Sequence, residues 1–176
     1  MSTELIWIGR EQYEEQVFRR GGSSTIYFLT DNLLGKFIGN GRGSLRADPA
    51  ARKLLQREAK IAQFLYENDV PVARPYGVHD IPLHYSLRQT GRRVEEKFPC
   101  FVQEFLDVPM LRSLEYIQRV EGMVMARRLL EELGERVGLA SARDALSESN
   151  ILFNPTSREI RLVDFAEWAF QGMEFE

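Results

Sequence analysis

The stretch Leu146-Ser147-Glu148-Ser149-Asn150-Ile151-Leu152-Phe153, followed by Ile160-Arg161-Leu162-Val163-Asp164-Phe165, decides the fold of this chain. A turn-rich patch, Asn154-Pro155-Thr156-Ser157-Arg158, joins two short apolar runs, which is the pattern of a β-hairpin. In an antiparallel hairpin the first residue of one strand lies beside the last residue of the other, so Asn150 and Asp164 are predicted to be neighbours. Their amide and carboxylate oxygens suit Mg²⁺, which takes its other ligands from water and phosphate. The alternative is that Asn150 caps a turn and Asp164 only ends a strand.

Composition limits the function classes. The 176 residues are 44% hydrophobic, which is enough for one good core or for two small lobes that share a cleft. The net charge of −3 implies no overall attraction to nucleic acid or to anionic membranes. A single cysteine, Cys100, excludes an intrachain disulfide framework and predicts a reducing, cytoplasmic location. No window approaches the roughly 20 apolar residues of a membrane span, so no transmembrane segment is expected.

Two charged residues occupy apolar surroundings. Residues 14–38 predict a three-stranded meander, and Lys36 lies in its third strand, where an ammonium group needs a partner. Asp48 and the following proline predict a helix from Pro49 to Glu67, and Glu58 falls within its apolar stripe. A buried carboxylate is costly unless a cation matches it, so we expect Glu58 to pair with Lys36.

Each of these charges also has a simpler explanation. Lys36 could guard an edge strand against aggregation. Glu58 could lie on the border of the stripe and pair with Arg57 or Lys60 at the surface.

The ordered set resembles the protein-kinase-like superfamily. Leu146–Leu152 resembles the metal-binding half of the catalytic loop and is most similar to the RIO kinases, with the KEOPS kinase subunit and the lipopolysaccharide Kdo kinases as near relatives. Val163-Asp164-Phe165-Ala166 resembles the Asp-Phe-Gly motif, with Ala in the Gly position. The resemblance implies an α+β, two-lobed kinase-like fold. An N-lobe of residues 1–106 would hold an antiparallel sheet and one helix, and a much reduced helical C-lobe of residues 107–176 would carry the hairpin.

The resemblance also implies ATP and Mg²⁺ as cofactors. By this similarity Lys36 holds the phosphates, Glu58 orients Lys36, and Asn150 and Asp164 bind Mg²⁺.

Adenine and phosphate contacts are implied at two further places. The strand ending at Leu106 resembles the hinge, where the backbone of Glu104 and Leu106 would face adenine; the alternative is an ordinary core strand. Gly21, Gly22 and Ser23 resemble a degenerate phosphate-covering loop, although Gly-Gly is also a standard hairpin turn.

The catalytic loop departs from the family pattern. Counting back from Asn150, the family's catalytic Asp falls on Ala145 and its His on Arg143, while Asp144 is one residue away. Either the loop carries one extra residue and Asp144 is the base, or the base is absent. The preferred function is therefore an ATP-dependent phosphotransferase or ATPase with an unidentified acceptor. The alternative is a catalytically impaired nucleotide-binding or scaffold protein.

Two apolar features complete the prediction. Residues 114–137 are expected to form a helix with a broad apolar face in the core, made by Ile117, Val120, Val124, Leu129, Leu130, Leu133 and Val137. A C-terminal aromatic segment follows the hairpin, with Trp168, Phe170, Met173 and Phe175. This segment either completes the core of the second lobe or waits for a protein partner.

Overall fold

A computed structural model of the chain describes residues 17–20, 23–40, 44–86 and 93–175. The chain forms two compact units. Unit 1 consists of the residues up to Gln56 together with Tyr76–Phe105, and unit 2 consists of Arg57–Pro75 together with Leu106–Glu176. The lobe boundary predicted at residue 106 stays a prediction. No helix within the described ranges is long and apolar enough to span a membrane.

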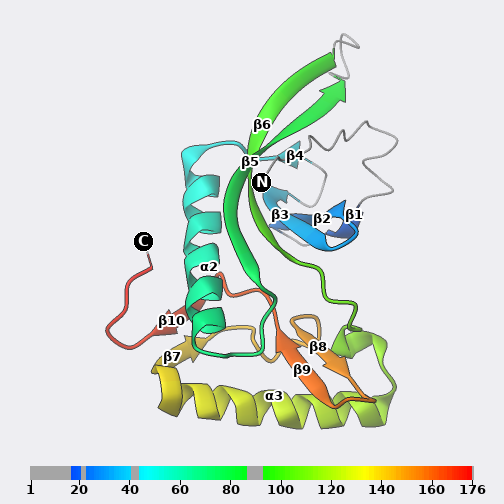
Figure 1. The fold of residues 1–176 in the computed structure, drawn as a ribbon, viewed down its shortest axis with the longest axis vertical. Helices are drawn as coiled ribbons and strands as arrows, with labels where there is room; N and C mark the ends of the chain where they lie inside the picture. Colours follow the sequence, from blue (N-terminus) through cyan, green and yellow to red (C-terminus); the bar gives the residue numbers. More distant parts are fainter. Residues whose placement is uncertain (1–16, 21–22, 41–43, 87–92, 176) are drawn as a thin grey trace. The chain divides into compact units, whose positions relative to one another are not determined.

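Unit 1 is built on a six-stranded sheet with the order β1-β2-β3-β6-β5, and β4 pairs with β3 (Figure 1). Its strands are β1 Val17–Arg20, β2 Ser24–Thr30, β3 Leu33–Asn40, β4 Ser44–Leu45, β5 Pro75–Ser86 and β6 Arg93–Glu104. The first three strands pair antiparallel in succession, which confirms the predicted meander over the described part of residues 14–38. The predicted central strand ending at Leu106 is also present as β6, which lies between β3 and β5 and ends at Glu104, two residues earlier than predicted.

The core of unit 1 is an apolar cluster from β2, β3, β5 and β6. It contains Tyr27, Leu29, Phe37, Leu83, Phe98, Cys100 and Val102. The rings of Tyr27 and Phe37 meet edge to face with centroids 5.5 Å apart, a favoured aromatic geometry. Burial of Cys100 raises the pKa of its thiol well above the ordinary value, because the thiolate is not solvated there.

Helix α2 spans Pro49–Glu67, with the bounds that the sequence predicts. Its start is fixed by Asp48, whose Oδ1 accepts the backbone N–H of Ala51 at 3.0 Å. The Arg46 guanidinium, 2.7 Å from Asp48, and this capping bond together lower the pKa of Asp48 to about 2. The apolar stripe of the helix buries Leu55, Ile61 and Leu65 completely.

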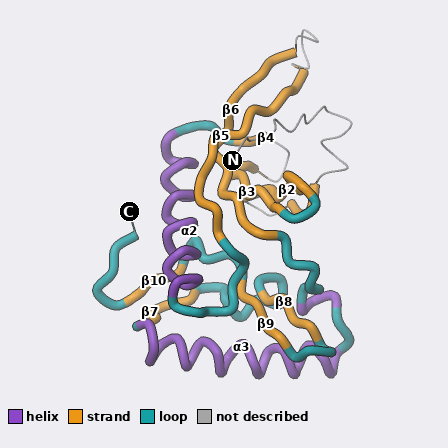
Figure 2. The backbone as a smooth tube through the Cα atoms, viewed as in Figure 1, coloured by secondary structure: helices purple, strands orange, loops and turns teal. Residues whose placement is uncertain are grey.

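Unit 2 combines one long helix with two small two-stranded sheets. After the 3₁₀ turn η1, Leu111–Ser113, come α3 Tyr116–Val137, β7 Leu139–Ala142, β8 Ile151–Asn154, β9 Glu159–Leu162 and β10 Trp168–Phe170. Strands β8 and β9 form the predicted antiparallel hairpin, and β7 pairs with β10. Helix α3 runs beside this hairpin and contacts both of its strands (Figure 2).

The predicted core face of α3 is wrong in its N-terminal half. Ile117, Val120 and Val124 are exposed, whereas the buried residues of α3 are Gly122, Ala126, Leu133 and Val137. The small residues face the hairpin because the packing is close there: a Cβ on Gly122 would lie 2.5 Å from Cδ1 of Leu111 and 3.1 Å from Phe153. Hydrophobic periodicity finds apolar stripes, but it does not show which of two stripes packs.

The C-terminal aromatic residues belong mostly to the core of unit 2. Trp168 is fully buried and Phe170 is 5% exposed. The ring of Phe64 lies 5.1 Å from that of Phe170 and 5.7 Å from that of Phe175. Of the two predicted roles, burial supports the core for Trp168 and Phe170, while Met173 is exposed.

Candidate catalytic and metal-binding site

The open end of the β8–β9 hairpin gathers two of the predicted site residues. Ile151 pairs with Leu162, and the ladder continues one step further because the N–H of Val163 donates to the carbonyl of Asn150 at 3.1 Å. Asp164 follows Val163 directly. The structure therefore brings Asn150 and Asp164 to the same end of the hairpin.

Asn150 is held by the loop that precedes it. Its side chain is buried, and Nδ2 donates to the backbone carbonyl of Asp144 at 3.2 Å. The hydroxyl of Ser149 donates to Oδ1 of Asn150 at 3.4 Å and lies 2.8 Å from the hydroxyl of Ser147. Asn150 thus caps a turn, as one alternative states. The capping bond uses Nδ2, so the amide oxygen keeps a lone pair with which it could bind a metal ion. The cap is therefore compatible with metal binding.

Both aspartates near Asn150 adopt left-handed backbone conformations. The φ angle is 58° at Asp144 and 69° at Asp164, and both side chains are exposed. Non-glycine residues rarely occupy this region, which is costly because Cβ approaches the backbone, although Asp tolerates it better than most. Such strained residues concentrate at functional sites, where surrounding contacts hold them in place.

The loop places Asp144, rather than residue 145, toward solvent. Ala145 is 1% exposed, while Asp144 is exposed and its carbonyl is bound by Asn150. A carboxylate at position 145 would be buried, whereas Arg143, Asp144 and Leu146 are all exposed. The assignment of Asp144 as the base of a loop with one extra residue stays a prediction.

Residues after Asp164 are anchored by contacts that the sequence does not reveal. Arg57 of α2 donates to the carbonyl oxygens of Ala166 and of Trp168, the latter at 2.8 Å. Arg143 lies 3.6 Å from Glu167 in an exposed ion pair. The partners of Arg57 are backbone carbonyls, which every residue carries, so no sequence signal identifies them.

Lys36 and Glu58 are both buried. Lys36 is 9% exposed and lies in the central strand β3, opposite Ile26 of β2 and Phe101 of β6, so the edge-strand alternative is wrong. Glu58 is 3% exposed, so the surface-pair alternative is also wrong. Burial of each charge agrees with the sequence prediction that each side chain requires a polar partner.

The residues predicted to contact adenine and the phosphates would do so through backbone groups. Glu104 ends β6 opposite Leu33, and the carbonyl of Leu106 accepts the N–H of Val108 at 2.8 Å. Ser23 is exposed, whereas Gly21 and Gly22 lie outside the described residues.

The donor set at the hairpin end fits Mg²⁺ better than a soft metal. No cluster of three or more His, Cys, Asp or Glu side chains suited to a metal occurs in the parts of the chain that the structure describes. A cation at this end would take the amide oxygen of Asn150 and the carboxylate of Asp164. Hard oxygen ligands few in number are typical of Mg²⁺ bound together with phosphate.

Comparisons with known proteins identify the fold. No protein-family model and no curated protein matches the sequence. The crystal structure of an Stt7 homologue from Micromonas algae, soaked with ATP, matches with a TM-score of 0.60 and 15% identity over 88% of this chain and 49% of that chain. The Rio2 kinase–ADP/Mg²⁺–phosphoaspartate complex from Chaetomium thermophilum matches with a TM-score of 0.53 and 16% identity over 93% of this chain and 52% of that chain.

The predicted fold class is confirmed. The chain has an α+β, protein-kinase-like fold, and it spans about half the length of the solved chains that it matches. The structural match shows the fold alone, and function has to be argued from the site.

Proposed function

We propose that this chain, with its kinase-like fold, binds ATP and Mg²⁺ and either transfers the γ-phosphoryl group to an acceptor hydroxyl or hydrolyses ATP. One observation carries the proposal: Asn150 and Asp164 lie at the open end of one hairpin, the Asn150 amide holds the backbone carbonyl of Asp144, and both aspartates have left-handed backbone conformations. The similar solved structures were obtained with ATP or with ADP and Mg²⁺, which supports the choice of ligands.

Asn150 and Asp164 are the proposed metal ligands. When bound, Mg²⁺ neutralises charge on the phosphate oxygens. The bond from Nδ2 of Asn150 to the Asp144 carbonyl fixes the amide, so its oxygen is the ligand atom. Asp164 has a left-handed backbone conformation two residues after the end of β9.

Asp144 is the proposed base. Its carboxylate would accept the proton of the acceptor hydroxyl, or of water, as that oxygen bonds to the γ-phosphorus and the bond to the ADP oxygen breaks. Asn150 acts on this step indirectly, because it holds the Asp144 backbone.

The remaining roles concern nucleotide binding. Lys36 would contact phosphate oxygens and Glu58 would orient it, a pairing proposed from their opposite charges and their burial. The backbone of Glu104 and Leu106 would bind adenine, and Gly21, Gly22 and Ser23 would cover the phosphates.

A second candidate function is a catalytically impaired nucleotide-binding or scaffold protein. Two observations favour it: the family's catalytic Asp position is the buried Ala145, and Arg143 stands in place of His and pairs with Glu167. In this case the Mg²⁺ and ATP site would exist without the base.

ADP release from ATP in the presence of Mg²⁺ separates these functions. We expect wild-type turnover that falls roughly 10²-fold or more in Asp164→Ala, because a ligand of the Mg²⁺ that would neutralise the phosphate charge is lost. Asp144→Ala should fall by roughly 10²–10⁴-fold, the range for a general base. Asp107→Ala, which removes an exposed carboxylate in unit 2, is the matched control and should keep wild-type activity.

The outcome also distinguishes the two candidates. Mg²⁺-dependent ATP binding without turnover would favour the second candidate. Turnover unaffected by Asp144→Ala would contradict the role of Asp144 as the base. Absence of ATP binding would overturn both.

A further inference from the structure

Arg57 of α2 holds the segment that follows Asp164 at two points. Its Nη1 donates to the carbonyl of Ala166, and its Nη2 donates to the carbonyl of Trp168 at 2.8 Å. Both bonds lie within unit 2, and the side chain of Arg57 is half-buried. A planar guanidinium carries its donors in a rigid fork, so two bonds from one side chain fix the positions of both acceptors. Arg57 therefore clamps the backbone two and four residues after Asp164.

The clamped segment is also closed by a turn. The N–H of Trp168 donates to the carbonyl of Phe165 at 3.0 Å. Phe165 and Trp168 are 2% and 0% exposed, and their rings meet edge to face with centroids 5.1 Å apart. Trp168 also pairs with Ala142 of β7, two residues before Asp144. The clamp thus lies where the segment after Asp164 pairs with the strand that leads to Asp144.

Asp164 lies between this clamp and the hairpin ladder. On its N-terminal side the N–H of Val163 donates to the carbonyl of Asn150 at 3.1 Å. On its C-terminal side Arg57 holds Ala166. Non-glycine residues rarely adopt a φ angle such as the 69° of Asp164, and they keep it only where surrounding contacts hold the backbone. Loss of the contacts on either side would let the backbone of Asp164 relax.

We propose that Arg57 is a positioning residue for Asp164, an inference that rests on the proposed function because it takes Asp164 as a Mg²⁺ ligand. Arg57 holds the backbone of Ala166 and Trp168, and this anchor keeps the Asp164 carboxylate in place for the metal ion. Arg57 acts through the backbone, so the ligand atoms stay those of Asn150 and Asp164. Residues that orient metal ligands in this way contribute about 10- to 100-fold to metal affinity.

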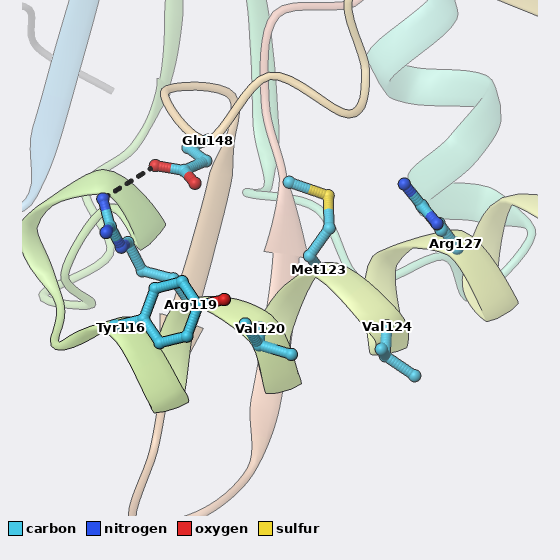
Figure 3. A pocket seen from close by; sticks show the side chains of 7 residues that line it. All are labelled: Tyr116, Arg119, Val120, Met123, Val124, Arg127 and Glu148. Carbon is cyan, nitrogen blue, oxygen red and sulfur yellow. Dashed lines mark hydrogen bonds and ion pairs between the residues drawn. The ribbon is translucent and has the colours of Figure 1, made fainter.

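A second arginine contacts the loop of the other proposed ligand in a different way. Arg119 of α3 lies 3.4 Å from the carboxylate of Glu148, two residues before Asn150, as the dashed line in Figure 3 shows. The Glu148 side chain is 41% exposed, and surface ion pairs of this kind contribute little to stability. Asn150 is held instead by its own bond to the carbonyl of Asp144. Arg119 is thus a comparison for Arg57, because its contact with the loop is to a side chain rather than to the backbone.

Binding of a non-hydrolysable ATP analogue to the full chain, measured by calorimetry with and without Mg²⁺, tests the role of Arg57. The ratio of the two affinities is the Mg²⁺-dependent gain. Arg57→Gln should lower this gain by about 10-fold or more and leave the Mg²⁺-free affinity close to that of the wild type. Arg57→Lys should fall between the two, because a compact ammonium lacks the fork that reaches both carbonyls. A merely structural role would change both affinities together.

Two other arginines of unit 2 give matched controls. Arg136→Gln removes the same kind of bond, from Nη2 to the backbone carbonyl of Asn68 at 3.1 Å. Arg119→Gln removes one positive charge and the ion pair with Glu148. Both variants should keep the Mg²⁺-dependent gain of the wild type. An equal loss of the gain in either control would overturn the proposal, because net charge or general stability would then explain the effect.

Amide hydrogen exchange without nucleotide tests the clamp independently of function. In Arg57→Gln the amide of Trp168 should exchange roughly tenfold faster, because the turn opens more often once its carbonyls lose a charged donor. Arg136→Gln should leave this exchange unchanged. If Arg57→Gln does not fold, Arg57→Lys decides the case, with effects in the same direction.

The two measurements separate this inference from the proposed function. Unchanged exchange at Trp168 in Arg57→Gln would overturn the inference alone, and so would faster exchange with the Mg²⁺-dependent gain retained. A wild type without any Mg²⁺-dependent gain would overturn the proposed function, and this inference with it.

Discussion

Lys36 in unit 1 is buried in the middle of a sheet, whereas Asp144 and Asp164 in unit 2 are exposed on turns with φ angles of 58° and 69°. The sheet fixes the direction of Lys36 through pairing on both sides, and its cost is the desolvation of a charge. The turns fix the aspartates through the Asn150 amide and the hairpin ladder, and their cost is backbone strain. The same fold therefore positions charged groups by two physical means, which respond differently to substitution.

The largest stability effect should come from overpacking, and both units should show it. A Cβ on Gly35 of β3 would lie 2.6 Å from Sγ of Cys100 and 2.9 Å from Leu29, and one on Gly122 of α3 would lie 2.5 Å from Leu111. Gly35→Ala and Gly122→Ala should each lower the free energy of unfolding by about 1–3 kcal/mol, measured by urea denaturation.

Gly134→Ala is the matched control. It lies in α3, where an added Cβ meets only the Leu139 carbonyl at 3.9 Å. It should raise the free energy of unfolding by up to about 1 kcal/mol, since Ala favours a helix. Equal destabilisation at all three glycines would contradict the packing described for both units.

Relief of backbone strain by glycine should stabilise unit 2 at Asp164 but not unit 1 at Asp31. At Asp164, glycine adopts the left-handed conformation without strain, so Asp164→Gly should be more stable than Asp164→Ala by about 1 kcal/mol, and both should lose Mg²⁺-dependent nucleotide binding. Asp31, on the β2–β3 turn of unit 1, is not among the residues with positive φ in the described ranges. There the glycine variant should gain nothing over alanine, and an equal gain would refute the strain at Asp164.

The smallest effect concerns the start of α2. The pKa of Asp48 is about 2 in the folded chain, against 3.8 for the free group, because Arg46 and the helix N-terminus favour the carboxylate. Because the pKa is lower in the folded chain, the ionised Asp48 stabilises the fold at pH values above 3.8. This contribution is lost as the pH falls through about 2. Asp48→Asn keeps a cap without the charge. The difference in free energy of unfolding between the wild type and this variant, measured by urea denaturation, should shrink as the pH falls from about 5 to about 3. A difference that does not change with pH would contradict the lowered pKa.

Local signals in the sequence predict most of the fold. Helix Pro49–Glu67 follows from its Asp-Pro start, and the hairpin follows from two apolar runs around a turn-rich patch. The buried face of α3 is not predictable in this way, because the helix has apolar residues on two sides and the choice depends on close packing at Gly122.

The sequence predicts where Asn150 and Asp164 lie in the hairpin, but it does not predict the contacts that hold the surrounding loops. Spacing places Asn150 and Asp164 at one hairpin end, as the structure also does. The left-handed backbone at Asp144 and the bonds from Arg57 to Ala166 and Trp168 involve backbone groups, which carry no side-chain signature.

The most direct test of the central claim is thermal unfolding with a non-hydrolysable ATP analogue, with and without Mg²⁺, in the wild type and in Asp164→Ala. A ligand at 100 times its dissociation constant stabilises the folded state by about 2.7 kcal/mol, which is readily measured. We predict a Mg²⁺-dependent rise in the Tm of the wild type and loss of the Mg²⁺-dependent part in Asp164→Ala. An unchanged wild-type Tm, or an equal Mg²⁺-dependent rise in Asp164→Ala, would contradict nucleotide binding at the hairpin end.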